Sequence, residues 1–389
     1  MNGGESPMNV AIRCDASHAI GTGHVMRCLT LADQLHERGA EVTFLCREHD
    51  GNINDYIAQR GYEVIRLPHA HSKYECHPRE GEGPSSFDSS SSEYARWLAV
   101  PIEIDARETV AALRERAGAV DWLIVDHYGL DERWEQGMRT LTRRIMAIDD
   151  LANRRHDCDL LLDQGHYPYQ LQRYRNLVPP TCRALLGPEY ALLRPEFLRG
   201  RAGLRHRDGV VRRILLFFGG VDPTNETAKA ICALQPLCRD DLLVDVVVGG
   251  ANQHHESIRP MCDRQPAMSY HRNVNNMAEM MARADLAIGG GGATTWERCY
   301  LGLPSVVLVM AENQRFMVEA LAAEGALINA GWYADLSVRD LTTLISSLLE
   351  QPRLLQSIIR ATLSIMGDRD TQAAQPVAKT MLEFVHAQA

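Results

Sequence analysis

The sequence predicts an α/β protein made of two doubly wound, Rossmann-like halves, each with a parallel sheet. Three observations support this prediction. Short apolar runs alternate with stretches of helical spacing along both halves of the chain. Several of these runs end in glycine, most clearly at Gly219 and Gly289. The chain has 389 residues, and at roughly 100–200 residues per domain that length favours two domains.

In the first half, the expected strands cover residues 9–14, 41–46, 62–67, 121–126, 143–149 and 160–163, and the expected helices cover 25–38, 53–60 and 103–117. Short joints between them indicate βαβ units. Residues 69–92 interrupt the alternation with a serine-rich stretch, for which we expect an exposed loop.

In the second half, we expect strands at 211–218, 243–248, 285–288 and 305–309, and helices at 224–234, 277–283 and 294–301. Residues 200–212 have the composition of a linker. The domains expected are therefore 8–205 and 206–370, followed by a C-terminal helix within 371–389 whose candidate packing partner is the N-terminal domain. Ligands of such folds bind beyond the carboxyl ends of strands, which here predicts a cleft between the halves.

Composition narrows the class of partner. A formal net charge of −9 argues against nucleic acid, whose backbone requires a clustered basic face. The ten cysteines are scattered without a C-x-x-C pair, so we expect neither a disulfide framework nor a metal. There is no apolar run of ~18 residues and no signal-peptide pattern, so we expect no membrane partner and a cytoplasmic protein.

The strongest chemical signal is the run Gly289-Gly290-Gly291-Gly292, between an expected strand and a helix that opens on Ala293-Thr294. Glycine lets a ligand approach the backbone and leaves amide groups free, and a helix start adds positive potential. A flexible turn is the alternative, but a bound phosphate explains four successive glycines better. The run is neither the G-x-G-x-x-G of dinucleotide sites nor a P-loop.

Several side chains near this run are candidates for binding. Glu297 could accept hydrogen bonds from a ribose diol or be an ordinary helix carboxylate. Gly219-Gly220 could face the same phosphates or form a common loop between a strand and a helix. Asn313-Gln314 follows the last expected strand, and its amides suit sugar hydroxyls or N-acetyl groups.

The first half offers a candidate base. His24 opens a helix after Gly21-Thr-Gly23, where a neutral imidazole could accept a proton. A histidine that only bonds backbone is the more frequent case. Asp126-His127-Tyr128 and Asp149-Asp150 follow other strands; acid–base or divalent-ion chemistry is open to them, although loop capping is favoured.

Four motifs together resemble a known family. They are Arg13-Cys-Asp-x-Ser-x-x-Ile-Gly-x-Gly-His-Val-Met-Arg-Cys-Leu-Thr-Leu-Ala32, Asp126-His-Tyr-Gly129, Ile148-Asp-Asp-Leu151 and Gly289-Gly-Gly-Gly-Ala-Thr-Thr-Trp-Glu-Arg298. They resemble the UDP-2,4-diacetamido-2,4,6-trideoxy-β-L-altropyranose hydrolases of pseudaminic acid biosynthesis, from about residue 8 to 370. The second half also resembles, more distantly, the UDP-GlcNAc-using transferase that makes lipid II.

The resemblance implies a GT-B-like fold with an interdomain cleft. It implies that water attacks the anomeric carbon of a UDP-sugar with inversion and that His24 is the general base. We further expect a monomer that uses no cofactor and binds no partner beyond the UDP-sugar. The substrate-binding residues it implies are Asp15, Gly23, Arg27, Tyr94, Gly219, Gly220, Val274 for uracil, Gly290, Gly291, Gly292, Ala293 and Thr294 for diphosphate, Glu297 for ribose, Asn313 and Gln314.

Three alternatives remain open at this point. The chain could be a GT-B glycosyltransferase with a UDP-HexNAc donor, a hydrolysing 2-epimerase, or a UDP-sugar-binding module without chemistry. One departure from the family is Gly165, where Asp-Gln-Asn is usual and this chain has Asp-Gln-Gly. One sugar contact could be lost there.

Overall fold

A computed structural model describes residues 7–69, 93–116, 118–238, 241–367 and 376–386. Most of the expected serine-rich loop and of the extreme N-terminus lies outside these residues. Contacts divide the chain into two compact units. Unit 1 comprises the chain up to Asp163, Tyr169–Leu186 and the end from Val377, and unit 2 comprises Gln164–Pro168 and Gly187–Pro376. Residues 187–205, which the expected boundary places in the N-terminal domain, thus belong to unit 2.

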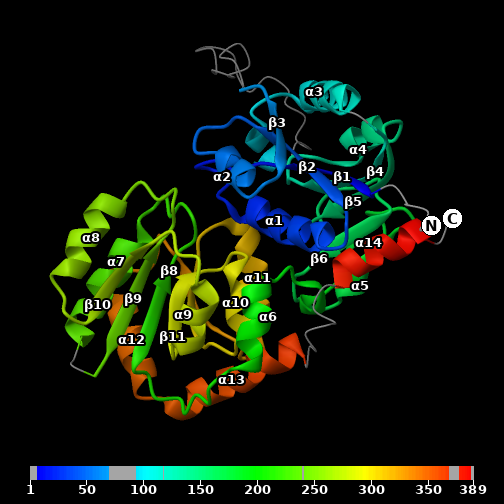
Figure 1. Cartoon of the computed structure of the whole chain (residues 1–389). Helices are drawn as coiled ribbons and strands as arrows, with labels where there is room; N and C mark the ends of the chain where they lie inside the picture. Colours follow the sequence, from blue (N-terminus) through cyan, green and yellow to red (C-terminus); the bar gives the residue numbers. More distant parts are fainter. Residues whose placement is uncertain (1–6, 70–92, 117, 239–240, 368–375, 387–389) are drawn as a thin grey trace, which may run out of the picture. The chain divides into compact units, whose positions relative to one another are not determined.

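Unit 1 is a seven-stranded, wholly parallel sheet of order β3-β2-β1-β4-β5-β6-β7 (Figure 1). Its strands are β1 (Asn9–Cys14), β2 (Glu41–Arg47), β3 (Glu63–Leu67), β4 (Val120–Asp126), β5 (Thr142–Ile148), β6 (Leu160–Asp163) and β7 (Arg183–Leu186). Its helices are α1 (Gly23–His36), α2 (Asn54–Gln59), η2 (Glu93–Leu98), α3 (Ile102–Glu115), α4 (Glu132–Met138), α5 (Gln170–Arg173) and α14 (Pro376–His386).

The last helix, α14, completes unit 1 although it follows unit 2 in the sequence. Val377, Ala378 and Met381 are buried. The Phe384 ring meets Trp122 of β4 edge-on, with 5.6 Å between centroids. An aromatic pair of this kind, together with three buried aliphatic residues, fixes a helix through apolar burial.

Unit 2 is a six-stranded parallel sheet of order β10-β9-β8-β11-β12-β13. Its strands are β8 (Arg213–Phe217), β9 (Leu243–Val248), β10 (Met268–Arg272), β11 (Leu286–Gly290), β12 (Ser305–Val309) and β13 (Ile328–Trp332). Its helices are η3 (Pro188–Tyr190), α6 (Pro195–Ala202), α7 (Glu226–Leu234), η4 (Gln235–Leu237), α8 (His255–Asp263), α9 (Met277–Arg283), α10 (Thr294–Tyr300), α11 (Glu312–Ala323), α12 (Val338–Leu349) and α13 (Pro352–Met366).

The sheet of unit 2 is buried on both faces, as parallel sheets usually are. Along β8, Ile214 and Leu216 belong to one apolar cluster and Leu215 to the other. This explains why the strands read as continuous apolar runs and not as alternating ones. Within the described ranges, no helix has both the length and the apolar character needed to cross a membrane.

The strand order reverses direction once in each sheet. In unit 1 the chain runs from β1 to β2 and β3 on one side, then returns to the other side of β1 with β4. In unit 2 the same reversal separates β8 from β11. Ligands of open α/β sheets bind beyond the carboxyl ends of strands at such switch points. His24 follows β1, and the glycine run follows from β11, so both predicted motifs lie at a switch point.

Candidate functional site

His24 lies at the switch point of unit 1, in the first turn of α1. Its Nδ1 is 2.6 Å from Oδ1 of Asp126, the last residue of β4. Arg27 NH2 lies 3.2 Å from the same nitrogen. The shorter contact, to the carboxylate, favours the tautomer with the proton on Nδ1, in which Nε2 of the neutral ring is the proton acceptor. The side chain is 9% exposed, which leaves it close to solvent but largely held by protein. The geometry therefore gives His24 the form of a general base.

Arg27, one turn further along α1, binds the same carboxylate. Its Nε and NH2 each donate to Asp126 over 2.6 Å, and its NH1 donates to Asp150 over 3.3 Å. Burial acts to raise the pKa of Asp126, but Arg27 and then His24 outweigh it and hold that pKa below its usual value. Asp126 is consequently a carboxylate at all working pH values. The sequence favoured loop capping for Asp126, the usual role of an aspartate after a strand; its partners His24 and Arg27 lie 102 and 99 positions away in the chain.

Two aromatic rings contact the His24 imidazole. The Tyr128 ring meets the imidazole edge-on with 4.7 Å between centroids, and the Trp97 ring does so at 5.9 Å. Tyr94 packs edge-on against both of these rings. The Tyr128 hydroxyl donates to Asp150 over 2.5 Å. Tyr94 and Trp97, both on η2 and both partly exposed, are thus aromatic walls beside the candidate base, and Trp97 had no signal in the sequence.

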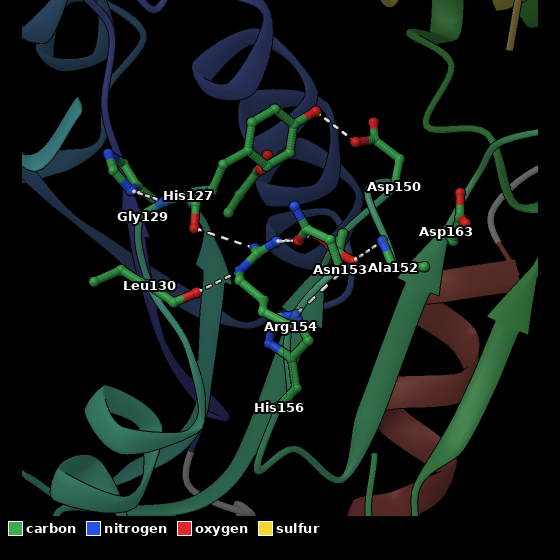
Figure 2. Close-up of polar contacts among 12 residues, drawn as sticks. His127, Gly129, Leu130, Asp150, Ala152, Asn153, Arg154, His156 and Asp163 are labelled. Carbon is green, nitrogen blue, oxygen red and sulfur yellow. Dashed lines mark hydrogen bonds and ion pairs between the residues drawn. The ribbon is translucent and has the colours of Figure 1, made fainter. Parts of the chain in front are cut away.

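The two neighbouring aspartates that follow β5, Asp149 and Asp150, differ in role. Asp149 is fully buried and accepts from Arg154 NH1 over 2.7 Å and from the Ala152 amide over 2.9 Å. Asp150 instead accepts from the Tyr128 hydroxyl, as the dashed line at Asp150 in Figure 2 marks, and from Arg27 NH1. Asp149 caps a loop, as the sequence favoured. Asp150 instead holds Tyr128 and Arg27, two residues that lie beside the candidate base His24.

His127 and Asp15 are both enclosed by protein. His127 Nδ1 accepts from the Gly129 amide over 3.0 Å, and burial lowers the pKa of His127 to about 3. It is a neutral ring that caps a loop. Asp15 has no exposed surface and accepts from Arg13 over 2.6 and 2.8 Å and from the Arg47 amide over 2.7 Å. Across the described ranges, no group of three or more histidine, cysteine, aspartate or glutamate side chains is placed to hold a metal ion.

The glycine run of unit 2, residues 289–292, is not a flexible turn but begins inside a strand. Gly289 and Gly290 are the last two residues of β11, and none of the four glycines has a positive φ. A Cβ on Gly289 would lie 2.1 Å from the Phe217 carbonyl oxygen, and one on Gly291 would lie 2.6 Å from a methyl of Val318. Only Gly292 borders open space, with nothing nearer than 3.9 Å. Packing therefore requires Gly289 and Gly291, whereas a Cβ on Gly290 would make a tight 3.1 Å contact with the Met310 side chain.

The amides at the end of the run decide what it can bind. The Gly291 amide donates to Gln314 Oε1 over 3.2 Å, and the same oxygen accepts from the Met310 amide. Gln314 thus holds the loop. The next two amides, of Gly292 and Ala293, find no acceptor among the described residues. Two adjacent free N–H groups are the donors an anion needs.

Glu297 follows on α10, one turn past these amides. Its Oε1 accepts from Arg194 over 3.1 Å (Nε) and 3.0 Å (NH2), whereas its Oε2 is buried without a partner. Burial raises the pKa of Glu297, and Arg194 opposes that rise. A buried carboxylate oxygen without a donor is unfavourable, so a ligand hydroxyl that reaches this carboxylate would stabilise it.

The remaining expected residues lie around the same strand ends. Gly219 and Gly220 follow β8, and Gly219 has a φ of 92°. A Cβ on Gly249 would lie 2.3 Å from the Gly220 oxygen, so the two loops pack backbone to backbone. Val274 is partly buried between β10 and α9, and the partly buried Asn313 lies in the first turn of α11. Gly23 is the first residue of α1, and Thr294 of α10.

Comparisons with known proteins agree with this fold. Residues 214–369 match the model of the Glycosyltransferase family 28 C-terminal domain. MurG of Acinetobacter baumannii aligns with a TM-score of 0.60, 16% identity and coverage of 97% of this chain and 100% of that one. Arabidopsis thaliana UGT89C1 complexed with UDP aligns with a TM-score of 0.62, 13% identity and the same coverage. The chain has the GT-B fold, as the sequence predicted.

Curated relatives are similar over most of the chain. Spore coat polysaccharide biosynthesis protein SpsG of Bacillus subtilis is 25% identical over 83% of this chain and 84% of its own. The UDP-2,4-diacetamido-2,4,6-trideoxy-β-L-altropyranose hydrolase of Campylobacter jejuni is 24% identical over 82% of this chain and 97% of its own. Protein MJ1062 of Methanocaldococcus jannaschii is 26% identical over 79% of this chain, which spans only 57% of that relative. The resemblance to the hydrolase is thereby confirmed.

Proposed function

We propose that this protein is a hydrolase that cleaves UDP from UDP-2,4-diacetamido-2,4,6-trideoxy-β-L-altropyranose. The observation that carries the proposal is the 2.6 Å contact between His24 Nδ1 and Asp126, which leaves Nε2 as a proton acceptor. An enzyme that activates water needs a base of this kind, oriented by a fixed carboxylate. The similarity to the Campylobacter hydrolase supplies the substrate.

The reaction is a displacement at the anomeric carbon. His24 Nε2 takes a proton from water while the water oxygen forms a bond to C1 of the sugar. The bond from C1 to the β-phosphate oxygen breaks, and its electron pair leaves with UDP. Attack opposite the leaving group inverts the anomeric configuration. The amides of Gly292 and Ala293 stabilise the charge that develops on the diphosphate, so the proposed step requires no metal or cofactor.

The other residues are assigned by the same proposal. Uracil is placed against backbone at Val274, the ribose on Glu297, and the sugar beside Tyr94 and Asn313. Three further residues that were expected to contact the substrate instead form hydrogen bonds with other protein groups: Asp15, Arg27 and Gln314. We assign these three to holding the site in shape.

Incubation of the protein with this UDP-sugar, followed by proton and phosphorus NMR, tests the proposal. UDP and free sugar should appear without any acceptor. The His24→Ala variant should lose roughly 100-fold or more in kcat while it still binds UDP. His36→Ala, an exposed position on the same helix, is the matched control and should keep full turnover. Normal turnover in the His24 variant would remove that residue from the mechanism.

A GT-B glycosyltransferase is the second candidate. The observation in its favour is that the solved structures similar to this chain include glycosyltransferases. Such an enzyme would use the same donor groups but transfer the sugar to an acceptor hydroxyl. It should release UDP only when acceptor is present, so the acceptor-free NMR experiment separates the two functions.

A further inference from the structure

Arg298, the residue after Glu297 on α10, is a buried cation without a carboxylate partner. Its side chain is 2% exposed, and no carboxylate oxygen of the described residues lies within 4 Å of it. Burial lowers the pKa of Arg298 to about 10. The guanidinium consequently keeps its charge at neutral pH. A buried charge of this kind calls for an explanation, because desolvation is costly unless an opposite charge is near.

The guanidinium lies against the glycine run. Its NH2 donates to the Gly290 carbonyl over 2.7 Å and to Thr295 Oγ1 over 2.9 Å. Its NH1 is close enough that a Cβ on Gly289 would lie 2.9 Å from it. The charge is thus fixed to the same short stretch of backbone whose next two amides, at Gly292 and Ala293, have no acceptor among the described residues.

In other buried arginines of this chain, nearby carboxylates or carbonyl oxygens compensate the positive charge of the guanidinium. Arg13, Arg27 and Arg47 of unit 1 each pair with a buried aspartate at 2.6–2.8 Å. Arg207 of unit 2 donates to backbone carbonyls at the C-terminal ends of α9 and α10, where helices carry negative partial charge. Arg298, in contrast, donates to one carbonyl and one hydroxyl oxygen, and its Nε is buried without a hydrogen-bond partner. Arg298 therefore has the fewest hydrogen-bond partners of this set.

We propose that Arg298 is a positioning residue whose fixed charge attracts the diphosphate to the glycine run without touching it. This inference rests on the proposed function, in which the run binds UDP. Coulomb attraction grows with the charge of the ligand, so the contribution of Arg298 should be largest for UDP, smaller for UMP and absent for uridine. A residue that merely pins α10 to β11 would support all three ligands equally.

Isothermal titration of uridine, UMP and UDP into the whole protein separates the two roles. Arg298→Gln keeps a donor for the Gly290 carbonyl and removes the charge, and it should bind UDP about tenfold and UMP about threefold more weakly, with uridine unchanged. Arg298→Lys keeps the charge and should bind UDP within about threefold of the wild type. Arg201→Gln, which removes a charge beside the Tyr300 carbonyl at the other end of α10, is the matched control.

The outcomes are distinct. Equal losses for all three ligands, or no loss of UDP affinity in Arg298→Gln, would overturn the role of Arg298 and leave the UDP site intact. A wild type that binds none of the ligands would overturn the proposed UDP site and this role with it. If thermal melting shows that the glutamine variant is unfolded, the lysine variant decides between the two roles. A purely structural role predicts that Arg298→Lys binds uridine more weakly than the wild type, whereas the charge role predicts unchanged uridine binding.

Discussion

Replacement of Asp126 by asparagine should separate catalysis from binding. Asp126 has no exposed surface and accepts three contacts of 2.6 Å, one from His24 and two from Arg27. The asparagine can present its NH2 group to His24 Nδ1, which places the proton on Nε2 and blocks the base. On that basis kcat should fall by about 10²–10⁴-fold, the contribution that a general base usually makes; the corresponding change in serine proteases lowers kcat by about 10⁴-fold.

The same substitution removes the charged partner that Arg27 contacts at 2.6 Å and leaves the 3.3 Å contact to Asp150 as its ion pair. Loss of one partner of a buried ion pair costs about 3–5 kcal/mol, which at roughly 2–4 °C per kcal/mol lowers the Tm of unit 1 by about 6–20 °C. UDP affinity should not change, because the groups assigned to UDP belong to unit 2.

The assay measures kcat by UDP release at 20 °C, UDP affinity by titration, and Tm by circular dichroism. Asp131→Asn is the control, since asparagine also caps a helix and Asp131 accepts from the amide of Arg133 on α4. Wild-type kcat in the Asp126 variant would refute the assignment of His24 as an oriented base. A simultaneous loss of UDP affinity would contradict the expectation that UDP binding in unit 2 does not depend on Asp126 in unit 1.

Three further predictions concern stability and binding. His127 has a pKa of about 3 in the folded protein and roughly 6.5 in the unfolded chain. Its contribution to the free energy of unfolding is therefore complete above pH 6.5 and is lost as the pH falls toward 3. Urea melts at several pH values should show that loss, and the His127→Asn variant should show a smaller dependence of stability on pH. Gly289→Ala should destabilise unit 2 by about 2–4 kcal/mol because its Cβ meets backbone at 2.1 Å, while Gly292→Ala should leave the Tm unchanged; equal Tm values would refute the packing argument. Arg194→Leu should weaken UDP binding about tenfold and 2′-deoxy-UDP binding less, because it frees the Glu297 carboxyl to protonate; equal losses for both ligands would contradict a ribose role.

Elements with strong apolar runs were predictable one by one. The strands expected at 9–14, 243–248 and 305–309 are β1, β9 and β12 with the same bounds. The edge strands β10 and β13 were not expected, because an edge strand is only partly buried and its sequence need not be apolar. Helix α12 was also missed, although its capping box, Ser337 with Asp340, is a signal that a sequence shows.

The sequence by itself determined the two doubly wound halves, the glycine run and the position of His24 at a helix start, since each depends on residues that are close together in the chain. The tertiary structure alone decided which groups complete the sites. Asp126 reaches His24 from 102 positions away, and Arg194 reaches Glu297 from 103. Parallel strands place their carboxyl ends at one edge whatever their separation in sequence, so a local pattern carries no record of these partners.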